Sequence, residues 1–133
     1  MSAERVTYLD SSAIVKLAVD EPESAALLRY LRRRRPLVSS ALARAEVARA
    51  LLPLGRSALR QGDEVLARLD LIRISDRILA GAGTLLPNEL PTLDAIHLAT
   101  AHLLGGDLAR VVTYDERMGA AAEAIGWPVA APA

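Results

Sequence analysis

The chain has 133 residues, 52% of them hydrophobic and 24% charged, which is typical of one folded domain and unlike a disordered segment. The formal net charge is zero, so a nucleic acid would have to be held by a local site and not by overall charge. The absence of cysteine excludes disulfides and thiolate zinc sites, and a 3% aromatic content argues against recognition by base stacking.

The opening residues and the apolar runs bear on location. The start, MSAERVTYLD, places an acid and a base before a short apolar run, which is not the pattern of a signal peptide. No apolar run approaches the roughly 20 residues that cross a bilayer. We therefore expect a cytoplasmic protein with no membrane partner.

Short apolar strands alternate with helices along the chain. We predict a strand over 5–9, helices over 13–19 and 24–34, a strand over 37–38, helices over 41–52 and 57–69, a strand over 71–74, a helix from Asp76, a loop over 87–91, a helix over 93–104, a strand over 111–113, a helix from Asp115 or Glu116 and a strand over 126–129. Expected helix caps are Ser11 or Ser12, Ser39 or Ser40, Asp76 and Thr92. This alternation predicts an α/β domain over 1–133, with a central parallel sheet covered by helices on both faces.

Four acids fall where such a fold places its ligands, beyond the carboxyl ends of the strands. Asp10 directly follows the strand VTYL, and Asp115 follows VVTY. Glu46, in ALARAEVARAL, and Asp94, in TLDAIHLATA, lie early in helices that start near the same edge.

Each acid also has a structural interpretation. Asp10 can simply end its strand, Asp115 can cap a helix, and Asp94 can favour the positive end of a helix dipole. Glu46 is harder to explain in this way, because its helix is apolar nearly all round and a buried carboxylate needs a cation or hydrogen-bond donors.

Taken together, the acids indicate a cation site. Several carboxylates in one place repel one another and raise one another's pKa unless a divalent cation neutralises them. Mg²⁺ prefers such hard oxygen ligands and retains several waters, and a metal held in this way can activate water against a phosphodiester. The spacing alone leaves this open, since acids at strand ends are common in α/β domains.

The segments YLDSSAIVKL, SSALARAEVARAL, LPTLDAIHLATA and VVTYDERM, in this order, resemble the signature blocks of PIN domains, especially VapC toxins. The resemblance extends to the terminal GWPV and so covers nearly the whole chain. It implies a PIN-like three-layer α/β/α sandwich whose acids converge in a negatively charged cleft. By position, Asp10, Glu46, Asp94 and Asp115 match the family's four acids, and Ser12 and Thr113 match two supporting hydroxyl residues.

The resemblance implies a Mg²⁺-dependent endoribonuclease toxin of a type II toxin–antitoxin system, with Mn²⁺ as a possible substitute. Asp10, Asp94 and Asp115 would hold the metal, and Glu46 would be a ligand or would orient the attacking water. The implied partners are an RNA substrate, a VapB-type antitoxin and a second copy in a homodimer, with DNA bound only through the antitoxin. The rival within the family is an inactive PIN-like module that binds RNA or protein, although no acid is missing here.

Other residues have weaker claims. His97 could ligate metal, but a packed or supporting histidine is the simpler interpretation, and His102 is expected to face solvent. Arg117, two residues after Asp115, could touch a substrate phosphate. The run Arg32 to Arg35 could hold RNA phosphates or could be a solvated helix end. A phosphatase of the phospho-aspartate type would need a second aspartate where Ser12 stands.

Overall fold

The computed structural model describes residues 5–133, so the first four residues, on which the expectation of no signal peptide partly depends, lie outside the described part. The strands are β1 (Val6–Leu9), β2 (Leu37–Ser40), β3 (Asp70–Ile72), β4 (Leu108–Val112) and β5 (Val129–Ala130). The α-helices are α1 (Ser11–Ala18), α2 (Ser24–Leu31), α3 (Ala43–Leu51), α4 (Arg56–Leu66), α5 (Asp76–Gly83), α6 (Thr92–Leu103) and α7 (Glu116–Ile125). Short 3-10 helices, η1 (Leu52–Leu54) and η2 (Gly105–Asp107), follow α3 and α6.

The strands form one parallel sheet in the order β3-β2-β1-β4-β5. The chain builds outward from β1 to β3 and then returns to the other side of β1 with β4, so the order reverses between β1 and β4. In open α/β sheets, ligands bind beyond the carboxyl ends of the strands at such a reversal point. The topology therefore singles out the residues that follow Leu9 and Val112.

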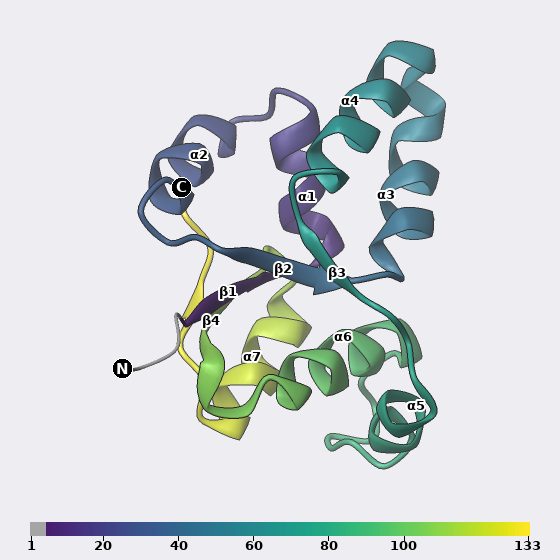
Figure 1. The fold of residues 1–133 in the computed structure, drawn as a ribbon, viewed down its shortest axis with the longest axis vertical. Helices are drawn as coiled ribbons and strands as arrows, with labels where there is room; N and C mark the ends of the chain where they lie inside the picture. Colours follow the sequence, from purple (N-terminus) through teal and green to yellow (C-terminus); the bar gives the residue numbers. More distant parts are fainter. Residues whose placement is uncertain (1–4) are drawn as a thin grey trace.

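Two helical layers enclose the sheet, as Figure 1 shows: α1 to α4 lie on one face and α5 to α7 on the other. Successive residues of β1 point to opposite faces, as in any strand, and join separate cores. Leu9 packs with the helices of the first layer, and Tyr8 packs with α6 and α7. This is the predicted three-layer α/β/α sandwich with a central parallel sheet.

The predicted helix caps were partly wrong. Asp10, and neither Ser11 nor Ser12, caps α1, because its carboxylate accepts a hydrogen bond from the Ala13 amide. Ser75 and not Asp76 caps α5.

At the remaining helix starts the outcome also varies. Thr92 is the first residue of α6 and gives no side-chain cap, and Pro91 precedes it. Contrary to our prediction, neither Ser39 nor Ser40 caps α3, because the helix begins after Leu42 and Ser40 instead accepts from the Leu42 amide in the preceding turn. Asp115 caps α7, as the sequence allowed.

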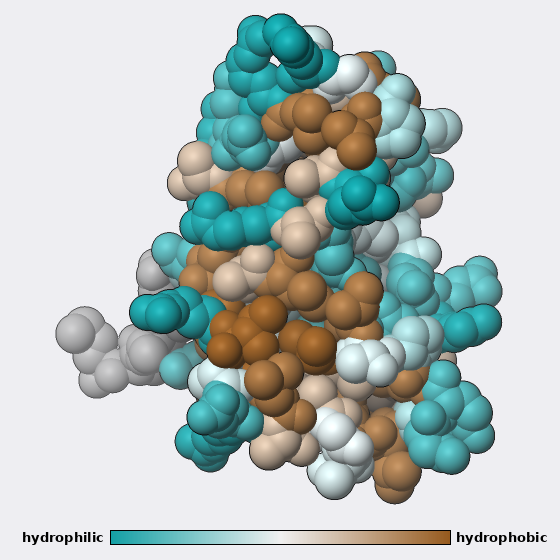
Figure 2. Space-filling model, turned by 90° about the vertical axis from the view of Figure 1, so that its right-hand side faces the viewer, coloured by the Kyte–Doolittle hydropathy of each residue, from teal (hydrophilic) through white to brown (hydrophobic). Residues whose placement is uncertain are grey.

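Apolar side chains are also exposed on the surface. Figure 2 looks onto the side of the molecule that carries α5 and shows hydrophobic atoms in a patch bordered by hydrophilic ones. The large hydrophobic residues with the most exposed side chains include Leu52, Leu54 and Leu86. Among the described residues, no helix combines the length and apolar character needed to cross a membrane.

Candidate active site

Asp10 lies at the end of β1 with its side chain almost fully buried. Its Oδ1 accepts hydrogen bonds from the Ser12 hydroxyl at 2.6 Å and the Ala13 amide at 3.1 Å. Its Oδ2 accepts from the Thr113 hydroxyl at 2.6 Å. Burial raises the pKa of Asp10 above its usual value, against the lowering effect of these three donors. The carboxylate is therefore fixed in one orientation at the reversal point of the sheet.

The same two hydroxyls hold the segment after β4. Ser12 Oγ accepts from the Tyr114 amide at 3.0 Å, and Thr113 Oγ1 accepts from the Asp115 amide at 3.0 Å. Asp115 in turn caps α7, because its Oδ1 accepts from the Met118 amide at 3.1 Å. Each hydroxyl thus donates to Asp10 and receives from the backbone that carries Asp115. This arrangement accounts for hydroxyl residues at both predicted supporting positions.

Glu46 is half-buried near the start of α3, where Ala43, Val47 and Leu51 form the packed face. Its Oε1 lies 2.6 Å from Ser11 Oγ, which donates to it, and 2.6 Å from His97 Nε2. Burial alone would raise the pKa of Glu46, but the hydrogen bonds from His97 and Ser11 outweigh it and lower the pKa. Glu46 is therefore held ionised at neutral pH.

Asp94 is the third residue of α6 and is partly exposed. Burial, followed by the charges of Asp115 and Asp10, raises the pKa of Asp94, and Glu46 acts in the same direction. Asp94 thus feels the negative charge of all three other acids, which come from distant parts of the sequence. The structure brings the predicted acidic quartet into one electrostatic neighbourhood.

The donor set fits a hard divalent cation in its chemistry. It consists of carboxylate oxygens whose mutual repulsion, seen at Asp94, is what a cation would relieve. Within residues 5–133, no group of three Asp, Glu or His side chains is already close enough to ligate one ion. A bound cation would therefore require rotation of partly exposed side chains such as Asp94 and Asp115, while Asp10 is already fixed.

Three further residues belong to the site that sequence reasoning did not assign to it. The sequence predicted Ser11 only as a cap and His97 as a metal ligand or, more simply, a packed or supporting residue, and it gave no role to Tyr8. The Tyr8 hydroxyl lies 2.7 Å from His97 Nδ1, and His97 is buried, which confirms the packed interpretation of this histidine. The available signal was the i, i+3 spacing of Asp94 and His97 on one helix. His102 is exposed, as expected.

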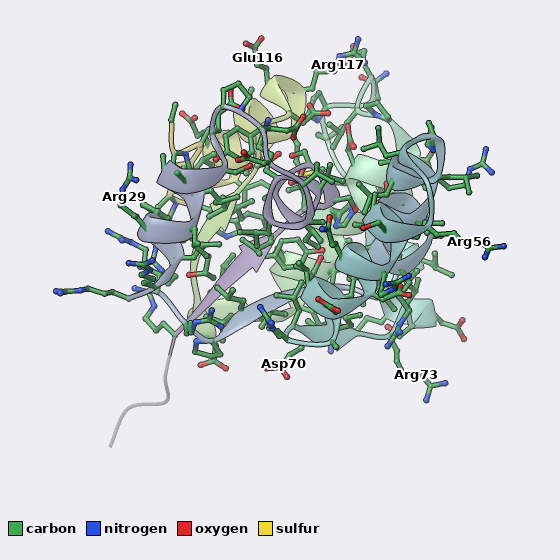
Figure 3. All side chains as sticks on the ribbon, turned by 90° about the horizontal axis from the view of Figure 1, so that it is seen from above. Arg29, Arg56, Asp70, Arg73, Glu116 and Arg117 are labelled. Atoms are coloured by element: carbon green, nitrogen blue, oxygen red, sulfur yellow. The ribbon has the colours of Figure 1, made fainter. Side chains whose placement is uncertain are left out.

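Among the described residues, Arg117 and the run Arg32 to Arg35 form no hydrogen bond or ion pair with the four acids. Arg117 projects outward from the surface (Figure 3), where it borders an apolar groove between α7 and the loop before α6. The run Arg32 to Arg35 follows α2 and precedes β2, which puts it at the amino edge of the sheet, opposite the acids. Arg34 stacks on Tyr30 at 3.8 Å and donates to its carbonyl oxygen, which favours the solvated helix end over an RNA contact.

Comparison with known proteins supports the assignment of the fold. The PIN domain profile matches residues 7–124. Ribonuclease VapC46 of Mycobacterium tuberculosis (strain ATCC 25618 / H37Rv) is 66% identical over 125 residues, which cover 94% of this chain and 96% of that protein. Ribonuclease VapC35 of the same strain is 43% identical over 130 residues, with the same coverage.

Two solved structures have the same fold. The M. tuberculosis toxin VapC20, described as a sarcin-ricin loop cleaving toxin, has a TM-score of 0.72 and 15% identity, covering 91% of this chain and 95% of that one. A toxin–antitoxin complex from Klebsiella pneumoniae has a TM-score of 0.70 and 22% identity, covering 96% and 98%. The chain belongs to the PIN domain family and, within it, to the VapC ribonuclease toxins of toxin–antitoxin systems.

Proposed function

We propose that this chain is a divalent-metal-dependent endoribonuclease that acts as the toxin of a type II toxin–antitoxin pair, with its single domain spanning 1–133. The observation that carries the proposal is the convergence of Asp10, Glu46, Asp94 and Asp115 at the reversal point of the sheet. A structural role for all four would not need them within electrostatic reach of one another, where their charges repel in the absence of a cation, as the raised pKa of Asp94 shows.

Mg²⁺ or Mn²⁺ would be held by Asp10, Asp94 and Asp115. The bound cation would supply Lewis-acid stabilisation of the phosphate and a more acidic water. Asp10 would be a ligand of fixed orientation, because burial and three hydrogen-bond donors hold its carboxylate in place. Glu46 is ionised and can orient a water molecule and accept its proton, or can serve as a further ligand.

RNA is the substrate that we propose, in keeping with the ribonuclease family. Arg117 is exposed at the second position of α7, two residues after Asp115. From there it can reach a phosphate of an RNA bound at the acids. Such a contact would add affinity without forming the nucleophile, so its loss should be less severe than loss of an acid.

The proposed regulation follows the family and the toxin–antitoxin complex among the similar structures. A VapB-type antitoxin would cover the acidic cleft, the toxin would form a homodimer, and DNA would be bound only through the antitoxin. An inactive PIN-like module is not favoured, because all four acids are present and hydroxyl residues orient the most buried of them.

The proposal can be tested in cells and with purified protein. Expression of the chain alone should arrest bacterial growth, and the purified protein should cleave RNA with Mg²⁺ or Mn²⁺ but not with EDTA. Asp10→Ala and Asp94→Ala should abolish both effects, and Arg117→Ala should weaken them in part. Asp70→Asn is a matched control, since Asp70 is an exposed acid that projects from the molecule far from Arg117 (Figure 3).

Co-expression of the cognate antitoxin should restore growth. The outcome that contradicts the proposal is an Asp10→Ala protein that, expressed at the wild-type level, arrests growth or cleaves RNA as strongly as the wild type. In that case the activity would not depend on the acidic site.

A further inference from the structure

A buried chain of polar groups leads from the sheet to Glu46. The Tyr8 hydroxyl, on β1, lies 2.7 Å from His97 Nδ1, and His97 Nε2, on α6, lies 2.6 Å from Glu46 Oε1 on α3. Tyr8 and His97 are both essentially inaccessible to solvent. The chain therefore connects β1 and α6 with α3, on the other face of the sheet, and ends at a partly exposed carboxylate of the proposed site.

The donors and acceptors in this chain can be assigned by chemistry. A carboxylate oxygen can only accept, so Nε2 must carry the proton that it shares with Glu46 Oε1. In the neutral ring Nδ1 then accepts from the Tyr8 hydroxyl, in agreement with the finding that no buried side-chain nitrogen or oxygen of residues 5–133 lacks a partner. The interaction with Glu46 therefore fixes one tautomer of His97.

The two oxygens of Glu46 are treated differently. Oε1 accepts from both Ser11 and His97, which uses its two acceptor positions. Within the described part of the chain, Oε2 accepts no hydrogen bond. Two donors on one oxygen thus stop the carboxylate from rotating and leave the other oxygen available to a ligand.

We propose that His97 is a positioning residue for Glu46: backed by Tyr8 and assisted by Ser11, it fixes Oε1 so that Oε2 is presented to the reacting groups. This inference rests on the proposed function, since it assigns Glu46 a part in the nuclease reaction. The competing explanation is that His97 only ties the layers together, in which case its removal would lower stability and leave turnover by the folded protein unchanged.

Replacing His97 with an amide residue can remove one of its two contacts and keep the other. The amide nitrogen of Asn lies near the position of Nδ1 and that of Gln near Nε2, so His97→Asn retains a partner for Tyr8 and loses Glu46, whereas His97→Gln does the reverse. Purified variants should be compared by kcat and KM on a short RNA, with His102→Gln, an exposed histidine of the same helix, as the control.

We expect His97→Asn to lower kcat about 10- to 100-fold with little change in KM, because groups that orient active-site residues have effects of this size. His97→Gln should recover most of that loss, and Ser11→Ala should cause a smaller one. When Glu46→Gln is already present, His97→Asn should lower kcat by less than about a further threefold, because the two residues act through one group. Wild-type turnover by folded His97→Asn, or full additivity with Glu46→Gln, would overturn the inference.

A spectroscopic measurement tests the contact without relying on activity or on a variant that folds. Nitrogen-15 NMR of the wild-type protein should show a proton on His97 Nε2. A ring protonated only on Nδ1 could not donate to Glu46 and would overturn the inference. If the wild type instead cleaves no RNA with any divalent cation, the proposed function fails, while the NMR result still decides whether His97 holds Glu46.

Discussion

Replacing Thr113 with valine should reveal how strongly the site is held by its hydroxyls. The Thr113 hydroxyl donates to Asp10 Oδ2 at 2.6 Å and accepts from the Asp115 amide at 3.0 Å, and the side chain is buried. Valine has nearly the same shape, so Thr113→Val removes two hydrogen bonds without opening a cavity. Both lost partners remain, one of them a buried carboxylate.

The expected loss of unfolding free energy is about 1–4 kcal/mol. A hydrogen bond to a charged group contributes about 1.5–3 kcal/mol, and a neutral bond to an amide about 0.5–1.5 kcal/mol. The methyl group that replaces the hydroxyl offsets about 0.8 kcal/mol through apolar burial. The charged bond to Asp10 therefore dominates the result.

The loss should also depend on pH. Burial raises the pKa of Asp10, and removal of the Thr113 donor, which lowers it, must raise it further. A folded-state pKa above the unfolded value of about 3.9 means that the folded carboxyl is mostly protonated by the time the pH reaches that value. The ionic hydrogen bond is absent there, so the destabilisation should be largest near neutral pH and should shrink toward pH ~4.

Urea denaturation in EDTA measures this effect, with equal m-values required for the comparison. Thr100→Val is the matched control, because Thr100 is also fully buried and its hydroxyl donates to the Ile96 carbonyl of its own helix and not to a carboxylate. That change should cost less than about 1 kcal/mol at every pH. Equal losses for the two variants, or a Thr113→Val loss that does not change with pH, would refute the argument that Thr113 acts through an ionised Asp10.

Three further predictions concern the acids themselves. Burial and the charges of Asp115 and Asp10 raise the pKa of Asp94, so the free energy of unfolding should fall as the pH rises through the folded-state pKa of Asp94. Asp94→Asn should therefore raise the metal-free urea midpoint at pH 7 and lose this advantage below pH ~4. Asp115→Ala should cost about 0.5–2 kcal/mol by removing the cap on the Met118 amide, while Asp115→Asn should cost little, since asparagine caps equally well; equal urea midpoints for the two variants would contradict this role. Mg²⁺ or Mn²⁺ at about 100 times its Kd should stabilise the wild type by about 2.7 kcal/mol, seen as a rise in Tm that Asp10→Asn reduces; identical melting curves with and without metal would count against the site.

The alternation of strands and helices was predictable because apolar runs of two periodicities are local features of the sequence. Their bounds were less so. The helix predicted over 24–34 ends at Leu31, since a turn intervenes before Pro36, and the strand predicted over 111–113 begins already at Leu108. The order of strands was not predicted, because it depends on packing between distant segments.

Helix caps show why local rules fail at this site. Ser11 and Ser12 have the side chains preferred for a cap, and Asp10 directly precedes them. Asp10 takes the position because the strand ends at Leu9, which leaves Asp10 with the extended backbone that a cap requires. Ser12 is then free to bridge Asp10 and the Tyr114 amide. The sequence indicated Asp10 and Asp115 from the ends of strands and Glu46 and Asp94 from the starts of helices, but it could not assign these hydroxyls to their partners.

The partners of the acids lie far away in the chain. Tyr8 and His97 are 89 residues apart, and His97 and Glu46 are 51 apart, so no spacing rule connects them. What connects them is the strand order, which places α6 and α3 on opposite faces of the sheet near the same strand ends. A polar residue on an apolar helix was therefore a sound indication that Glu46 needed donors, but only the fold identifies those donors.

The hydroxyl bridges also make the site depend on the alignment of β1 with β4. Tyr8 pairs with Val111 and Leu9 with Val112, so Asp10 lies beside Thr113. A shift of one residue between these strands would turn Thr113 to the opposite face and replace it beside Asp10 with a group that cannot donate in the same way. The two hydrogen bonds that cross between these segments, from Thr113 to Asp10 and from the Tyr114 amide to Ser12, would be lost together. The β1–β4 register that builds the centre of the fold is thus the same register that orients Asp10 and carries Asp115 into position.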